Sequence, residues 1–152
     1  METLKLTEEH FKKSNSYWSD YIGNVDVSSY NGNIEIDARL WYVRFNSIKA
    51  EGYIIAKAGS GIEADEGIEA GWGIEAGEGI KAGLGIKAVS GIEAGWGIEA
   101  GLSISCKWTI KFKFRIFAWL CIWKNPTDEE KTITFKRLEW GEIWYGILKE
   151  IK

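Results

Sequence analysis

Residues 61–102 read GIEADE GIEAGW GIEAGE GIKAGL GIKAVS GIEAGW GIEAGL, with an isoleucine at every sixth position. The isoleucine spacing runs without a slip from Ile62 to Ile122, and Ile48 and Ile54 continue it upstream across a two-residue insertion near residues 57–60. A fixed period of this kind is typical of stacked, structurally equivalent coils. We therefore predict an all-β fold, a parallel β-solenoid (β-helix) that serves as a scaffold and a binding surface.

Side chains alternate strictly within the repeat unit Gly-Ile-(Glu/Lys)-Ala-Gly-x. In a strand, Ile, Ala and x share one face, so we expect Ile and Ala inside and the charged residues outside. The same alternation places Trp72 and Trp96 inside, unless a glycine corner reverses them. Glycines permit corners where a positive φ or a neighbouring backbone would exclude a side chain. A helix is excluded, because six is not a multiple of 3.6 and each glycine would cost about 1 kcal/mol.

Two coil sizes are consistent with the repeat. Large apolar residues at 72, 84 and 96 alternate with polar ones at 66, 78 and 90, which favours a flattened coil of twelve residues. A triangular coil of eighteen residues would instead stack Glu63, Lys81 and Glu99 in one row, with opposite charges as neighbours at about 4.8 Å. Both alternatives stay open on the sequence alone.

The repeat divides a single domain, residues 1–152, into three parts. Residues 1–46 are expected to form an N-terminal cap, with a short helix over residues 7–13 and irregular entry strands at 25–27, 33–36 and 40–45. Residues 47–124 form the solenoid. Residues 125–152 contain a strand pair, 132–138 and 142–151, which we predict to be a hairpin cap. Caps are needed because a bare last coil exposes unpaired backbone groups.

No group of residues indicates catalysis, a cofactor or a metal site. His10 is the only histidine and has no evident catalytic partner. Cys106 and Cys121 are fifteen residues apart and out of phase with the repeat, so we expect small buried hydrophobes and not a disulfide or zinc site. The Gly-x-Gly triplets belong to the repeat and give no phosphate-binding signal. We expect a protein that is not an enzyme and needs no cofactor.

The sequence predicts a cytoplasmic protein without a membrane partner. Residues 1–13 lack the apolar core of a secretory signal. The most apolar run, residues 114–123, is about half the length of a membrane span and contains Arg115.

Charge is distributed unevenly and gives a first candidate surface, an acidic patch. Residues 58–102 contain eight acidic and two basic groups. Six of the acids fall close together in sequence and are the candidate partner-binding residues: Glu63, Asp65, Glu66, Glu69, Glu75 and Glu78. Stacked acids on a rigid frame can imitate a row of phosphates. Acids also keep a β-surface soluble and its edges apart, which is the simpler explanation.

A second candidate surface is basic and aromatic. Its residues are Lys107, Trp108, Lys111, Lys113 and Arg115. This composition is typical of surfaces that bind single-stranded nucleic acid. Alternation within a half-buried strand explains the same pattern, so we do not expect direct nucleic-acid binding. Exposed tryptophans at 72, 96 and 108 would instead indicate a partner site, for example for a glycan.

Three kinds of run carry a resemblance to a known group of proteins: Gly-Ile-Glu-Ala-Gly-Trp, Gly-Ile-Lys-Ala-Gly-Leu and Arg-Ile-Phe-Ala-Trp-Leu-Cys-Ile-Trp. In these runs the chain resembles small glycine-rich hexad-repeat proteins of phages and mobile elements of Gram-positive bacteria. The resemblance covers residues 47–124 and carries over no functional residue. It implies a context in which small non-enzymatic proteins often inhibit host defence nucleases, anti-CRISPR proteins among them. Our first hypothesis is therefore a protein-binding solenoid that inhibits a nucleic-acid-targeting defence complex through the acidic patch. The alternatives are a structural solenoid that forms homo-oligomers and a glycan-binding or surface-binding module.

Overall fold

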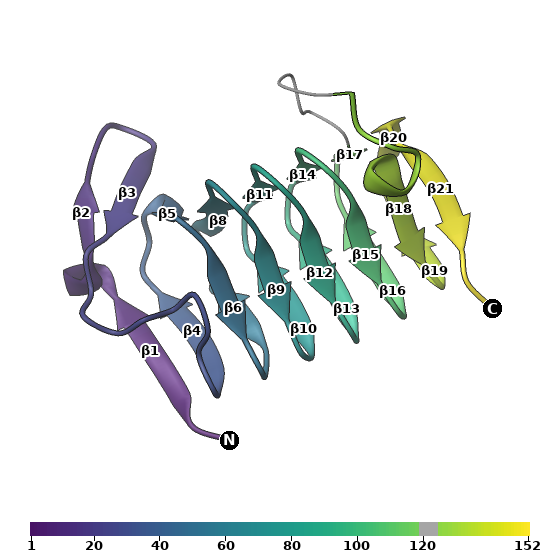
Figure 1. Cartoon of the computed structure of the whole chain (residues 1–152). Coiled ribbons are helices and arrows are strands. Elements are labelled where there is room, and N and C mark those ends of the chain that lie inside the picture. Colours follow the sequence, from purple (N-terminus) through teal and green to yellow (C-terminus); the bar gives the residue numbers. More distant parts are fainter. Residues whose placement is uncertain (119–124) are drawn as a thin grey trace.

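The computed structural model describes residues 1–118 and 125–152, whose strands wind into a three-sided solenoid (Figure 1). From residue 33 onward, successive strands pass from sheet A to sheet B to sheet C and back to sheet A in the next coil. Strands within a sheet pair in parallel, apart from the antiparallel pair of β2 (Phe11–Lys13) and β3 (Trp18–Tyr21). The predicted all-β parallel solenoid is confirmed.

Sheet A has seven strands: β1 (Thr3–Thr7), β4 (Asn33–Asp37), β7 (Ile54–Ala56), β10 (Gly73–Ala76), β13 (Gly91–Ala94), β16 (Thr109–Phe112) and β19 (Arg137–Glu139). Sheet B has eight: β2 (Phe11–Lys13), β3 (Trp18–Tyr21), β5 (Trp41–Phe45), β8 (Ser60–Ala64), β11 (Ile80–Ala82), β14 (Ile98–Ala100), β17 (Arg115–Ala118) and β20 (Glu142–Tyr145). Sheet C has six: β6 (Ile48–Ala50), β9 (Ile68–Ala70), β12 (Ile86–Ala88), β15 (Ile104–Cys106), β18 (Thr132–Phe135) and β21 (Ile147–Glu150). Two 3-10 turns, η1 (Glu8–His10) and η2 (Glu129–Lys131), complete the described elements.

Strand register shows that one coil of the repeat takes eighteen residues. Ile74 of β10 pairs with Ile92 of β13, and Ile80 of β11 pairs with Ile98 of β14. The triangular alternative therefore holds, and the twelve-residue coil is wrong. Ile54 pairs with Ile74, twenty residues on, so this earlier coil is two residues longer. That difference agrees with the insertion predicted near residues 57–60, directly after β7.

Isoleucines and alanines fill the interior, as predicted. The column isoleucines from Ile48 to Ile116 are at most 2 % exposed and stack one above another in each sheet. Burying one such side chain stabilises the fold by about 1.5–3 kcal/mol relative to leaving it in water. Cys106 continues an alanine column beside Ala88 and is buried, which confirms its role as a small hydrophobe. Cys121 lies outside the described residues.

Within residues 61–102, glycine follows alanine in five of the seven hexads, and Asp65 and Val89 take this corner position in the other two. Where glycine is present, it permits a close approach between coils. A Cβ on Gly95 would overlap the carbonyl oxygen of Gly77 in the preceding coil, and a Cβ on Gly101 would overlap that of Gly83. Glycine is required at these two positions because the backbone of the preceding coil lies so close, and not because φ is positive. The strand ends at alanine, so the residue after the corner glycine points outward, and Trp72 and Trp96 are 59 % and 46 % exposed. The prediction that they face the interior is wrong, because alternation does not continue through the corner.

Residues 1–46 form the first coils of the same stack. β4 and β5 pair in register with β7 and β8, which confirms two of the three predicted entry strands. Residues 25–27 are not in a strand. The helix predicted over residues 7–13 is wrong except for the single turn η1, because residues 11–13 form β2 and pair with β3. The ring of Phe11 is buried there against Phe45, which a solvent-facing helix would not allow.

Residues 132–150 continue the stack and do not form a hairpin. β18 to β21 each pair in parallel with the strand one coil earlier in the same sheet. The predicted hairpin is wrong, because Ile133, Leu138 and Ile143 extend the isoleucine columns. In the last coil, Ile143 and Leu148 hold column positions yet are 39 % and 45 % exposed. The apolar interior is thus partly open to solvent at this end.

Candidate functional site

The six acids predicted to form one patch lie on three sides of the solenoid. Glu63 faces outward from sheet B, Glu69 from sheet C and Glu75 from sheet A. Residues 65–66 lie at the corner between sheets B and C, and Glu78 at the corner between sheets A and B. Each hexad occupies one side of an eighteen-residue coil, so acids that recur every six residues fall on successive sides. Acids that are close in the sequence are therefore not gathered on one surface.

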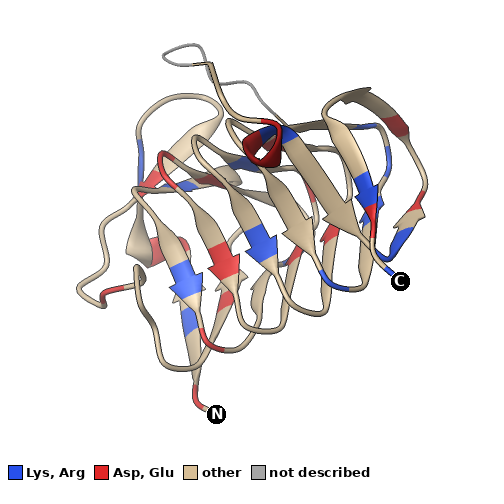
Figure 2. Ribbon diagram, turned by 45° about the vertical axis from the view of Figure 1, so that its right-hand side comes forward, with Lys and Arg blue, Asp and Glu red and all other residues tan. Residues whose placement is uncertain are grey.

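Lysines of neighbouring coils pair with three of the outward glutamates, Glu69, Glu93 and Glu99. Glu69 lies 3.2 Å from the Nζ of Lys49 and 3.6 Å from that of Lys87. Figure 2 shows this row as blue, red and blue on successive strands of sheet C. The Nζ of Lys111 lies 2.6 Å from Glu93, and this hydrogen bond raises the pKa of Lys111. Such exposed pairs add little stability, but they cancel negative charge on the faces.

The basic and aromatic candidate surface is also divided. Residues 107–108 lie at the corner between sheets C and A, and Lys111 lies on sheet A. The Nζ of Lys136 lies 4.8 Å from the ring centroid of Trp108 and covers that ring. Lys113 lies at the corner between sheets A and B, and Arg115 lies on sheet B. Only the last two contribute to the hollow that we consider the candidate site.

A column of glycines forms a trough on the outer face of sheet B. Gly61, Gly79 and Gly97 follow Tyr42 in one row, and Arg115 comes next. The ring of Tyr42 covers the first two positions, because a Cβ on Gly61 would lie 2.7 Å from the ring and a Cβ on Gly79 would overlap the hydroxyl. Tyr42 therefore fills part of the trough and does not reach Gly97, where a Cβ would instead lie 2.8 Å from the backbone oxygen of Arg115.

The open part of the trough is a groove of about 750 Å³, which we call the sheet B groove. Trp96 and Phe114 form one wall, with ring centroids 6.2 Å apart. Trp41, which does not line the groove, packs edge to face against Trp96 from an earlier coil, with ring centroids 6.0 Å apart. The groove is lined by Tyr42, Lys81, Trp96, Gly97, Glu99, Lys113, Phe114, Arg115, Gly141, Glu142 and Trp144. These residues come from several coils and include two of the predicted basic and aromatic set.

Charges of both signs accompany the rings. The Nζ of Lys81 lies 3.8 Å from an Oε of Glu99. The guanidinium of Arg115 lies 5.0 Å from the ring centroid of Trp144, whose Nε1–H donates to Glu142 at 3.1 Å. With three cations and two carboxylates among its lining residues, the groove is nearly neutral.

Tyr42 forms an uncharged end of the groove. Burial, together with the nearby carboxylates of Glu99 and Glu63, raises the pKa of Tyr42 to about 12. The Nζ of Lys81 lies 5.1 Å from the centroid of the same ring, a cation–π contact. The ring of Tyr42 thus lies between the glycines of sheet B and the ammonium group of Lys81, and these contacts fix the position of this end of the groove.

Trp72 and Trp96 occupy identical sequences in different surroundings. Residues 67–76 and 91–100 both read GIEAGWGIEA and begin 24 residues apart, which is one coil and a third. The first segment therefore runs from sheet C to sheet A and the second from sheet A to sheet B. Only Trp96 reaches the groove. Local sequence could not separate the two tryptophans, because the coil length decides which face each one joins.

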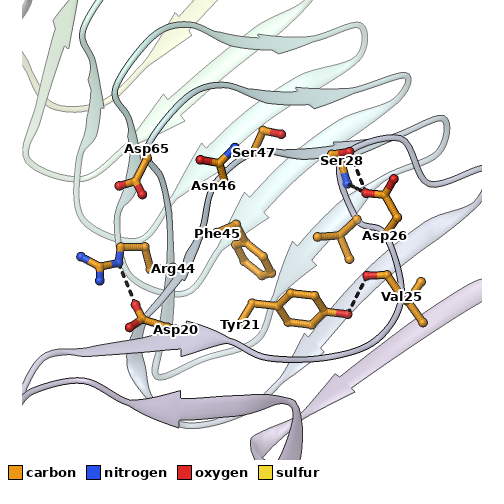
Figure 3. Close-up of a pocket in the computed structure, with 11 residues that line it drawn as sticks. Asp20, Tyr21, Val25, Asp26, Ser28, Arg44, Phe45, Asn46, Ser47 and Asp65 are labelled. Carbon is orange, nitrogen blue, oxygen red and sulfur yellow. Dashed lines mark hydrogen bonds and ion pairs between the residues drawn. The ribbon is translucent and has the colours of Figure 1, made fainter.

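A smaller hollow of about 390 Å³ lies beside the first coils (Figure 3). Its polar groups pair largely with one another. The Nε of Arg44 donates to Asp20 at 2.8 Å, the hydroxyl of Ser28 donates to Asp26 at 2.7 Å, and the hydroxyl of Tyr21 donates to a backbone carbonyl at 3.0 Å. This internal pairing leaves less capacity for a ligand than the sheet B groove has.

His10 has a structural partner at the first turn. Its Nδ1 accepts the backbone N–H of Thr7 at 3.1 Å. Within residues 1–118 and 125–152, no group of three or more His, Cys, Asp and Glu side chains could hold a metal ion. In the same ranges, no helix has the length and apolar character that crossing a membrane requires.

No protein-family model, curated protein or solved structure matches this chain. The fold and the site define its class as a parallel β-solenoid with an aromatic groove on one of three sides. The resemblance to phage-borne hexad-repeat proteins stays a prediction, and the function is inferred from the groove residues.

Proposed function

We propose that this protein is a non-catalytic binding module, in which a rigid solenoid presents the sheet B groove to an extended partner. The observation that supports this function is that Tyr42, Trp96, Phe114 and Trp144 line one groove together with Gly97. Large aromatic side chains and arginine carry much of the binding energy at protein surfaces. Tyrosine and tryptophan in particular bury a large area at a low cost in conformational entropy.

The solenoid provides a preorganised support for the groove. β14 lies beneath the groove in the middle of sheet B and pairs with β11 on one side and β17 on the other. Its backbone groups are therefore used within the sheet, so a partner has to bind through the outward side chains and not by adding a strand. Little ordering of the protein is needed on binding, which favours affinity.

Inhibition of a defence complex through an acidic surface has little support in this geometry. A surface that imitates nucleic acid needs a continuous row of unpaired negative charge. The six predicted acids instead lie on three sides, and Glu69 is shared by two lysines. The sheet B groove, and not the acidic patch, is the binding surface that we propose.

Photo-crosslinking tests this function even while the partner is unidentified. Phe114 is replaced by p-benzoylphenylalanine, whose excited ketone inserts into C–H bonds of any macromolecule in contact. The control carries the same probe at Trp72, which is exposed at another corner of the solenoid. In a cell lysate we expect a discrete high-mass adduct from position 114 and none from position 72. No adduct from position 114, or equal adducts from both, would contradict the proposal.

Self-association is a second candidate function, which the last coil favours. β19, β20 and β21 are the outermost strands at one end of their sheets, and the column residues Ile143 and Leu148 are exposed there. Unpaired strand edges are templates for pairing with another chain. Glu150 opposes such pairing, because it takes the inward position that Phe135 holds one coil earlier. Light scattering tests this function: a dimer that Ile143→Glu abolishes would support it, and a monomer at every concentration and salt would exclude it.

A further inference from the structure

We infer that the ligand of the sheet B groove is an uncharged carbohydrate chain. This inference rests on the proposed function and comes from the hydrogen-bonding groups beside the rings. Lys81 and Arg115 offer only donors, whereas Glu99 and Glu142 offer only acceptors. A ligand that uses all four must carry donors and acceptors side by side and still present apolar faces to the aromatic wall.

A sugar unit meets both requirements. Its C–H groups form an apolar face that packs on an aromatic ring, and each hydroxyl has one donor and two acceptor positions. The Nζ of Lys81 and the nearer Oε of Glu99 are 3.8 Å apart, which is beyond hydrogen-bond distance. Both groups therefore keep the capacity to bond a hydroxyl placed between them, which would donate to Glu99 and accept from Lys81.

The far end of the groove offers a second set of the same kind. The guanidinium of Arg115 contacts the ring of Trp144 at 5.0 Å from the centroid, and Glu142 accepts the Nε1–H of that ring. Stacking uses the face of a guanidinium and not its N–H groups, which lie in the plane and stay available as donors. Donor and acceptor are again adjacent, next to an aromatic surface.

Other ligand classes fit less well. A nucleic-acid strand would bring phosphates next to Glu99 and Glu142, which repel them. A cationic ligand would meet the three cations of the lining. A proline-rich peptide docks on aromatic grooves but has few N–H donors, so it would leave the carboxylates without partners. A neutral, hydroxyl-rich chain has none of these conflicts.

The aromatic wall indicates a chain and not a single sugar. Trp96 and Phe114 line one part of the groove and meet edge to face, with ring centroids 6.2 Å apart and ring planes at 90°. Trp144 lines another part from β20, two strands beyond β14 in sheet B. Rings in separate parts of the groove offer contacts to more than one sugar unit. We therefore expect an oligosaccharide to bind more tightly than its monosaccharide.

Isothermal titration calorimetry with the whole chain tests the inference. The probes are cellohexaose, chitohexaose and maltohexaose, with a dT oligonucleotide and a proline-rich peptide as the other ligand classes. We expect at least one hexasaccharide to bind with a Kd between about 10 μM and 1 mM. Trp96→Ala and Glu99→Gln should each weaken binding about tenfold or more. Their controls, Trp72→Ala and Glu75→Gln, alter the same positions of the identical segment and should leave the Kd within about twofold.

The possible outcomes separate the ligand class from the site. Absence of hexasaccharide binding, or equal loss in the control variants, would overturn the inference. Binding of the oligonucleotide or the peptide that depends on Trp96 would also overturn it, yet would support the groove as the binding surface. If no probe binds in a Trp96-dependent way and no adduct forms at position 114, both the inference and the proposed function fail. Glu99→Gln keeps the size of the side chain, so it remains informative if Trp96→Ala does not fold.

Discussion

Glu75 lies directly beside Glu93 in neighbouring parallel strands, although the two residues are eighteen positions apart in the sequence. Both side chains point outward from sheet A. The pair defines the coil length, because a twelve-residue coil would place Glu63 next to Glu75 instead.

A cysteine pair tests this register. In a Cys106→Ala, Cys121→Ser background, Glu75→Cys and Glu93→Cys together should form an intramolecular disulfide under mild oxidation. Adjacent strands bring the two Cα atoms to about 4.8 Å, within the range that a disulfide spans. Mass spectrometry of the digested protein detects the linked peptides. The matched pair Glu63→Cys with Glu75→Cys should stay reduced, and a disulfide there would contradict the eighteen-residue coil.

The isoleucine columns should stabilise the middle of the stack more than its end. Ile98 and Ile143 belong to the same column of sheet B, but the first is fully buried and the second is 39 % exposed. Ile98→Ala should lower the free energy of unfolding by about 2–5 kcal/mol, because it leaves a cavity. Ile143→Ala should cost about 1 kcal/mol or less. Urea denaturation measures both, and equal losses would show that the last coil is covered in solution.

A corner glycine whose Cβ would overlap the backbone of the preceding coil should not tolerate a side chain. Gly95→Ala places a Cβ against the carbonyl oxygen of Gly77 and should destabilise the fold by about 1–3 kcal/mol. Gly91 belongs to the same hexad, and a Cβ there would lie 3.4 Å from its nearest neighbour, the carbonyl oxygen of Thr109. Gly91→Ala should therefore change stability by about 0.5 kcal/mol or less. Thermal unfolding of the two variants checks the difference, and similar melting temperatures would refute the close corner packing.

Tyr42 should make stability fall at high pH. Its pKa is raised from 10.0 to about 12, so the folded state favours the neutral phenol. That contribution is complete below about pH 10 and is lost as the pH rises through about 12. The free energy of unfolding should therefore decline over this range, and it should decline less in Tyr42→Phe. Urea midpoints between pH 9 and 12 give the comparison. Parallel curves for the two proteins would mean that Tyr42 is not buried over the glycines.

The sequence period allowed the solenoid, its isoleucine columns and its outward charges to be predicted. The period could not predict what happens at the corners, because alternation holds only within strands of a few residues. The exposure of Trp72 and Trp96 was missed for that reason. The ends were also misassigned. Residues 11–13 pair with the nearby strand β3, and residues 132–150 pair with strands of the preceding coils, and the local sequence signals predict neither pairing.

The sheet B groove had a much weaker signal in the sequence. Tyr42 lies outside the regular repeat, and only the eighteen-residue coil brings it next to Gly61 and Gly79. Lys113 and Arg115 were identified as candidates, but they were predicted to share a surface with residues 107–111, which do not line the groove. One signal was available: a row read at steps of eighteen from Gly61 gives three glycines followed by Arg115, and such a row predicts a trough once the coil size is known.

The groove as the ligand site is tested most directly by the indole N–H resonances of the tryptophans. Protein labelled with ¹⁵N at the indole nitrogens is titrated in turn with cellohexaose, chitohexaose and maltohexaose, and single Trp→Phe variants assign the peaks. The resonances of Trp96 and Trp144 should shift with one common Kd. The resonances of Trp72 and Trp108, which are exposed at the corner between sheets C and A, should stay in place. Shifts of Trp72 and Trp108 in place of the groove residues, or no shift of Trp96 and Trp144 with any of the three sugars, would contradict this assignment.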